Sequence, residues 1–140
     1  KQQEEAKAKL RPLDGFADKV TAFNASDITE LTVETLTEGT GATVKENDTI
    51  SANFTGWLPD GTIFASTKSE GSNASSVSFT LSTSKIIEGW VIGLVGKRAG
   101  GVSLLSVPSD LGYGAAGSGD TIPANTPLRF IVQVVDITNQ

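Results

Sequence analysis

Three residue types are missing from this sequence: cysteine, histidine and methionine. Without cysteine the chain has no disulfide and no thiol nucleophile, and without histidine it has no Ser-His triad and no imidazole acid or base. The nitrogen and sulfur ligands that zinc usually takes in proteins are missing as well. The remaining chemistry is based on carboxylates, hydroxyls or non-covalent binding, so we expect no cofactor and no metal.

Positive charge and long apolar runs are also scarce. The chain has 11 Lys and Arg against 16 Asp and Glu, which gives a net charge of -5 at pH 7. An acidic chain without a basic patch is a poor match for the phosphate backbone of nucleic acids. No apolar run approaches the ~20 residues that a membrane-spanning helix needs. We therefore expect no nucleic-acid partner and no membrane span in this chain.

The first 27 residues differ in composition from the rest of the 140. Residues 1–10 are strong helix formers without an apolar stripe, and Pro12 ends this run. Residues 13–27 mix polar residues with Phe16 and Phe23, which we expect to rest on the following domain. Residues 1–27 are thus predicted to be a spacer or linker with a possible helix, and residues 28–140 to form the domain.

From residue 28 onward the apolar residues mostly alternate with polar ones, which is typical of half-buried strands. This pattern predicts strands near residues 31–35, 50–56, 63–64, 77–81, 102–107 and 128–137. One stretch has helical spacing instead, with Ile87, Trp90 and Leu94 on one face and Thr83 and Ser84 as possible caps. The sum predicts an α+β fold, an antiparallel half-barrel with one short helix.

Two aromatic residues are candidates for a site. Trp90 in the short helix could form the floor of a pocket or belong to an ordinary core, and aromatic residues more often have the second role. Tyr113 lies between Gly112 and Gly114 in a long irregular loop over residues 110–125, where its hydroxyl could reach into a pocket or anchor the loop. The residues alone leave both alternatives open.

Several stretches occur together in one order and spacing. They are Phe54-Thr55-Gly56, Asp60-Gly61-Thr62-Ile63-Phe64, Ile86-Ile87-Glu88-Gly89-Trp90, the run from Val107 to Gly114 and the run from Ile122 to Phe130. With these stretches the sequence resembles the FKBP-type peptidyl-prolyl cis-trans isomerases, the macrolide-binding immunophilins, over about residues 28 to 138. The segment Leu94-Val95-Gly96-Lys97 and the loop after Phe64 resemble bacterial members that have extracytoplasmic forms.

The resemblance implies a twisted antiparallel sheet wrapped around the short helix, with an apolar cleft between them. It implies that Trp90 is the pocket floor, that the Tyr113 hydroxyl points inward from the rim, and that the Ile87 N–H receives a substrate carbonyl. By the same resemblance, the catalytic residues are Phe64, Ile87, Trp90, Tyr113 and Phe130. The substrate-binding residues that it implies are Phe54, Ala65, Phe79, Ile86 and Ile122.

The sequence departs from the family pattern at three of these places. Ala65 stands where the family usually has an aspartate, Phe54 replaces a common tyrosine, and Val77 replaces a larger aromatic residue. These changes make the pocket more apolar and wider, so we expect a peptidyl-prolyl isomerase with reduced activity. The alternatives are a non-catalytic peptide-binding or chaperone module with a vestigial isomerase pocket, and a structural domain.

The resemblance also suggests partners and a compartment. We expect proline-containing polypeptide clients and a weakened affinity for macrolides such as rapamycin, because the aspartate would have accepted a hydrogen bond. A monomer is expected. The sequence begins at Lys1 and contains no methionine, so we expect it to be a mature or excised fragment. An extracytoplasmic protein, in the cell envelope or secreted and anchored by a segment before Lys1, is favoured over a cytoplasmic one.

Overall fold

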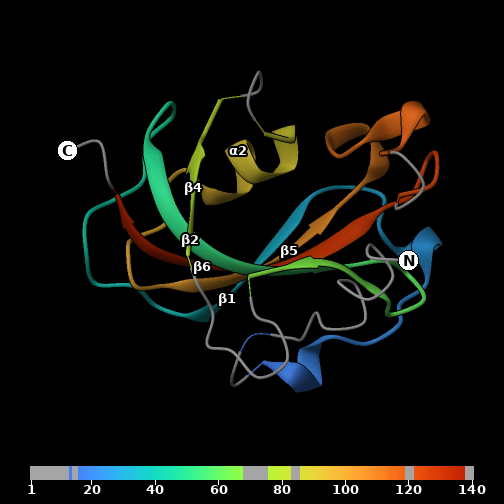
Figure 1. The fold of residues 1–140 in the computed structure, drawn as a ribbon, viewed down its shortest axis with the longest axis horizontal. Coiled ribbons are helices and arrows are strands. Elements are labelled where there is room, and N and C mark those ends of the chain that lie inside the picture. The colour runs from blue at the N-terminus through green and yellow to red at the C-terminus, as the bar shows by residue number, and fades with distance from the viewer. Residues whose placement is uncertain (1–12, 14–15, 68–75, 83–85, 119–121, 138–140) are drawn as a thin grey trace, which may run out of the picture.

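The computed structural model describes residue 13 and residues 16–67, 76–82, 86–118 and 122–137. Six antiparallel strands form one twisted sheet in the order β1-β5-β6-β2-β3, and β4 pairs with β2 beside β3 (Figure 1). Their bounds are β1 Thr32–Thr37, β2 Thr49–Trp57, β3 Ile63–Ser66, β4 Val77–Thr80, β5 Val102–Val107 and β6 Leu128–Ile137. The expected α+β fold is confirmed. The helix expected in residues 1–10 and the caps Thr83 and Ser84 lie outside the described residues.

The α-helix of the described residues, α2, spans Glu88–Leu94 and lies against one face of the sheet (Figure 1). It buries Trp90, Val91 and Leu94, which is the apolar face that the helical spacing predicted. Gly89 lets the helix approach the sheet, because a Cβ atom there would lie 2.6 Å from Val107 Cγ1. The helix ends before Gly96, whose φ of 95° suits glycine.

The long strands β2 and β6 present different residues to the two faces of the sheet. On the face toward α2, Phe54 and Phe130 join a core cluster with Trp90 and Leu94. On the opposite face, Trp57 and Ile131 belong to a second cluster. The sheet therefore has an apolar layer on each side, and each layer has its own cover.

Leu13 and residues 16–23, which we call the N-terminal strap, cover the face of the sheet opposite α2 (Figure 1). They include the 3-10 helix η1 (Ala17–Lys19), and η2 (Ala25–Asp27) follows them. Leu13 is buried, and Phe16, Val20 and Phe23 pack around the second cluster. The expected contact of Phe16 and Phe23 with the domain is confirmed, whereas the division of the chain at residue 27 stays a prediction.

Hydrogen bonds attach the strap to the strands beneath it. The Leu13 N–H donates to Thr55 Oγ1 over 3.1 Å, and the Trp57 indole N–H donates to the Thr21 carbonyl over 2.9 Å. The Arg129 guanidinium lies 4.7 Å from the centre of the Phe23 ring, within the range of a cation–π contact. In the described part of the chain, no helix has the length and apolar character to cross a membrane.

Candidate active site

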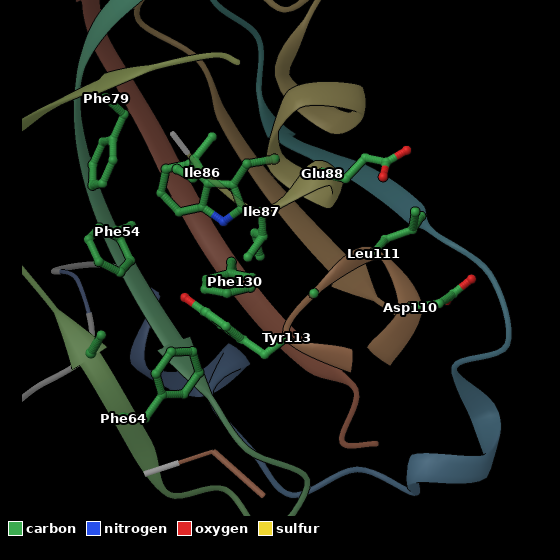
Figure 2. Close-up of a pocket in the computed structure, with 13 residues that line it drawn as sticks. Phe54, Phe64, Phe79, Ile86, Ile87, Glu88, Asp110, Leu111, Tyr113 and Phe130 are labelled. Carbon is green, nitrogen blue, oxygen red and sulfur yellow. The ribbon is translucent and has the colours of Figure 1, made fainter. Parts of the chain in front are cut away.

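A cavity of about 600 Å³ opens between α2, the strands β2 and β3, and the loop that follows β5 (Figure 2). All but one of the residues predicted to form the site line it: Phe54, Phe64, Ala65, Phe79, Ile86, Ile87, Trp90, Tyr113 and Phe130. The exception is Ile122, which is 3% exposed and belongs to the buried core cluster. The structure thus brings together residues from six separate segments of the sequence.

The cavity has four further lining residues that the sequence analysis did not single out: Glu88, Asp110, Leu111 and Gly112. All four lie inside the motifs that carried the family resemblance. The motifs could therefore have pointed to them, although only the fold shows that they reach the cavity. Val77, expected on the wider side, is exposed at the start of β4 and does not line the cavity.

Aromatic rings hold one another in place along the cavity wall. Trp90 meets Phe54 and Phe130 nearly edge to face, with ring centres 5.3 and 5.6 Å apart and interplanar angles of 83° and 87°. Phe79 lies 4.9 Å from Trp90, and Phe64 meets Phe130 at 5.6 Å and 85°. Edge-to-face pairs are the favoured geometry of aromatic rings. The wall is consequently preformed and apolar.

Trp90 combines the two roles that the sequence left open. Its side chain is 2% exposed and belongs to the core cluster, yet it also lines the cavity. Its Nε1–H finds no hydrogen-bond partner among the described residues. A buried donor without a partner is uncommon in proteins. The core therefore leaves the indole N–H of Trp90 without an acceptor on the side that borders the cavity.

Gly56 makes room for two of the rings. A Cβ atom at this position would lie 2.7 Å from Phe64 Cζ and 2.8 Å from two carbons of the Phe130 ring. Any side chain here would therefore push these rings from their places. Gly56 lies within one of the motifs, but the sequence alone gives it no role, because the rings that approach it come from β3 and β6.

Tyr113 adds a hydroxyl to a cavity lining that is aromatic and aliphatic apart from Glu88 and Asp110 at one rim. Figure 2 shows this hydroxyl pointing across the cavity toward the side that carries Phe54 and Phe64. Burial raises the pKa of the phenol above its ordinary value of 10.0. Since the neutral form donates a hydrogen bond, Tyr113 is a donor throughout the neutral pH range. The described residues provide no acceptor for it, and Ala65 offers only a methyl group.

The loop that carries Tyr113 is more regular than the sequence suggested. Two short 3-10 helices, η3 (Ser109–Leu111) and η4 (Gly114–Ala116), stand immediately before and after the Gly112-Tyr113 pair. The Asn125 N–H donates to the Gly114 carbonyl over 2.8 Å and ties the two ends of the loop together. The expectation of an irregular loop over residues 110–125 was therefore wrong for residues 110–111 and 114–116, which are helical.

The Ile87 backbone lies at the start of α2 and has no side-chain cap. Within the described part of the chain, its N–H donates no hydrogen bond to a backbone or side-chain oxygen. The Ile87 side chain lines the cavity. An N–H without a partner at the edge of a cavity is suited to bind a carbonyl of a ligand.

Comparison with known proteins places this geometry in a family. The family model described as "FKBP-type peptidyl-prolyl cis-trans isomerase" matches residues 41–135. The FK506-binding protein of Neisseria meningitidis serogroup A is 36% identical over 107 residues, which cover 76% of this chain and 95% of that protein. FK506-binding protein 2 of Kluyveromyces lactis is 36% identical over 119 residues, 83% of each chain.

A solved structure agrees with these sequence matches. The crystal structure of a peptidyl-prolyl cis-trans isomerase from Pseudomonas syringae pv. tomato is similar with a TM-score of 0.67 and 29% sequence identity. The match covers 96% of this chain and 86% of that one. The similarity thus extends over nearly the whole length of both chains.

Proposed function

This chain belongs to the FKBP-type peptidyl-prolyl cis-trans isomerases and has their activity, and we propose that it catalyses the isomerisation at a reduced rate. The X-Pro bond would rotate within the aromatic cavity. The observation that carries this proposal is the lining itself. It is preformed and largely apolar, and its wall at Phe54 and Ala65 has no polar side-chain group. No covalent step is needed.

The reaction is limited by the loss of amide conjugation. Rotation about a peptide bond faces a barrier of roughly 18–20 kcal/mol, and for X-Pro bonds it takes tens of seconds or longer. The twisted transition state is less dipolar than the planar amide. An apolar cavity therefore destabilises the planar ground state more than the transition state, and this difference lowers the barrier.

The residues divide this work by position. The proline ring would sit among Trp90, Phe64 and Phe130, whose edge-to-face contacts keep the space open. The Ile87 N–H would bind one flanking carbonyl, and the Tyr113 hydroxyl would bind another. Tyr113 is a donor at neutral pH, since the ordinary pKa of a phenol is already 10.0 and burial raises the pKa of this one further.

The reduced rate follows from what faces the Tyr113 hydroxyl. Ala65 has no carboxylate and Phe54 has no hydroxyl. Neither side chain can therefore orient the Tyr113 hydroxyl, or hold the twisted X-Pro bond of the substrate, by a hydrogen bond. A hydrogen bond to a charged group contributes about 1.5–3 kcal/mol. Its loss corresponds to a rate that is about tenfold lower, or more.

A protease-free isomerisation assay with a panel of X-Pro peptides tests this function. Wild-type protein at micromolar concentration should exceed the uncatalysed rate, and Ala65→Asp should raise kcat/KM about tenfold. If neither protein exceeds the background while isothermal titration calorimetry still shows peptide binding, the alternative of a non-catalytic binding module holds. An active wild type that Ala65→Asp leaves unchanged would contradict the reduced rate.

Clients, ligands and setting are part of the same proposal. We propose proline-containing polypeptides as clients, and macrolides such as rapamycin as weaker ligands than is usual for the family, because the Ala65 side chain accepts no hydrogen bond. Calorimetric titration of rapamycin into wild type and Ala65→Asp tests the second point.

We also propose that the protein is a monomer and that it works outside the cytoplasm. Light scattering after size exclusion would test the oligomeric state, and cell fractionation would test the compartment.

A further inference from the structure

The charged residues at the cavity carry a further inference, which rests on the isomerase function proposed above. Among the described residues that line the cavity, only Glu88 and Asp110 carry a charge, and both are acidic. Both side chains are exposed, and neither carboxylate forms an ion pair with a described residue. Whatever occupies the cavity therefore meets two negative charges that no described residue balances.

The two carboxylates lie at one rim of the cavity. Glu88 is the first residue of α2 and Asp110 is the middle residue of η3, and in Figure 2 they lie on either side of Leu111. Both point away from the rings of Phe54 and Phe79 on the far wall. A proline ring bound among the aromatic residues leaves its flanking residues at the rim, so these carboxylates face the flanks and not the ring.

We propose that Glu88 and Asp110 make the enzyme select X-Pro sites that are flanked by lysine or arginine. The same carboxylates act against sites with acidic or phosphorylated flanks. The net charge of -5 adds a long-range field of the same sign, which favours the approach of cationic segments. Glu88 and Asp110 thus determine which clients are preferred, whereas the aromatic residues of the cavity bind the proline ring that all clients share.

Three peptides test this selectivity. They share one X-Pro pair, and both flanking residues are Lys in the first, Gln in the second and Glu in the third. One exposed ion pair changes an affinity by about 1.5- to 5-fold. With two flanks and two carboxylates we expect kcat/KM to fall in the order Lys, Gln, Glu, with about a tenfold Lys-to-Glu ratio at low salt. At about 0.5 M salt the ratio should fall below about threefold, because exposed charges are screened.

Two double variants with the same change in net charge separate the rim from the general field. In Glu88→Gln with Asp110→Asn, the Lys-to-Glu ratio should approach about one. In Glu34→Gln with Glu46→Gln, which removes two exposed acids outside the cavity lining, the ratio should stay close to that of the wild type. A low-salt ratio below twofold in the wild type, or a ratio that survives in the rim variant, would overturn the proposal.

The Gln peptide keeps this test separate from that of the isomerase function. If its isomerisation does not exceed the background rate, the isomerase function fails. Calorimetric binding of the three peptides then still decides the selectivity. In that case the same order of affinities supports the role of Glu88 and Asp110, and equal affinities refute it.

Discussion

Trp57 and Trp90 are buried to nearly the same degree, 0% and 2% exposed, but they belong to opposite faces of the molecule. Trp57 lies beneath the N-terminal strap, and its indole N–H donates to the Thr21 carbonyl. Trp90 lines the cavity, and its indole N–H has no partner in the described part of the chain.

This difference teaches how one sheet divides its tasks between its faces. The strap face is closed, and the Leu13 N–H and the Trp57 indole N–H are both paired across it, so we expect its contacts to contribute mainly to stability. The cavity face keeps about 600 Å³ open against a wall of aromatic rings. An open apolar surface lowers stability but is what binding requires. Substitutions on the two faces should therefore affect different measurements.

The largest effect should come from Trp57→Ala. Removing a fully buried tryptophan leaves a cavity and an unpaired Thr21 carbonyl, and such substitutions cost about 3–5 kcal/mol of unfolding free energy. Urea denaturation measures this loss. Trp57→Phe is the milder control and should cost less because most of the apolar volume remains. A loss below about 1 kcal/mol in Trp57→Ala would show that the strap face is not closed as described.

Gly56→Ala should have the next largest effect and should act on the cavity. The added methyl group would displace Phe64 and Phe130, so we expect kcat/KM for X-Pro peptides to fall about tenfold, with a stability loss of about 1–3 kcal/mol. Gly93→Ala is the matched control, because its Cβ would lie 2.9 Å from Leu105 Cδ2 in the core. It should lose stability and keep its KM. Equal loss of kcat/KM in both variants would contradict the role of Gly56.

A smaller effect is expected for Thr55→Val on the strap face. The Thr55 hydroxyl accepts a hydrogen bond from the Leu13 N–H and lies 3.0 Å from Ser66 Oγ. Valine leaves the buried Leu13 N–H unpaired, at a cost of about 1–3 kcal/mol in unfolding free energy. Thermal denaturation measures it, and Thr55→Ser should restore most of the stability. If serine and valine behave alike, the hydroxyl does not hold the strap.

The smallest effect concerns Tyr113 and pH. Burial raises the pKa of its phenol above 10.0, so its contribution to stability is fully present below that value and is lost as pH rises through the higher pKa of the folded protein. Through Tyr113 alone, we expect no change in kcat/KM between about pH 6 and pH 9, where the phenol stays neutral. A pH–rate profile measures this. A decline near pH 8 that Tyr113→Phe abolishes would contradict it.

The order of elements could be predicted from local patterns. Alternating apolar residues predicted the strands, and the spacing of Ile87, Trp90 and Leu94 predicted the helix and its buried face. The family resemblance predicted nine of the thirteen residues that line the cavity, and it also predicted Ile122, which lies in the core instead. These features depend on periodicity or on short runs of residues, which a sequence displays directly.

Features made by residues far apart in the chain could not be predicted in this way. Leu13 pairs with Thr55 across 42 positions, and nothing near either residue indicates the partner. The sequence did not indicate that Trp57 is buried, because the residues that cover it belong to the N-terminal strap. Gly56 looks like any strand glycine until β3 and β6 bring Phe64 and Phe130 over it.

The presence of one indole on each face has a practical consequence for spectroscopy. The chain has only two tryptophans, so the variants Trp57→Phe and Trp90→Phe each leave a single fluorophore. Emission from Trp90 should change when a ligand fills the cavity, whereas emission from Trp57 should shift to the red only when the strap lifts. The molecule therefore carries two independent optical reporters, one for occupancy and one for the attachment of its N-terminal segment.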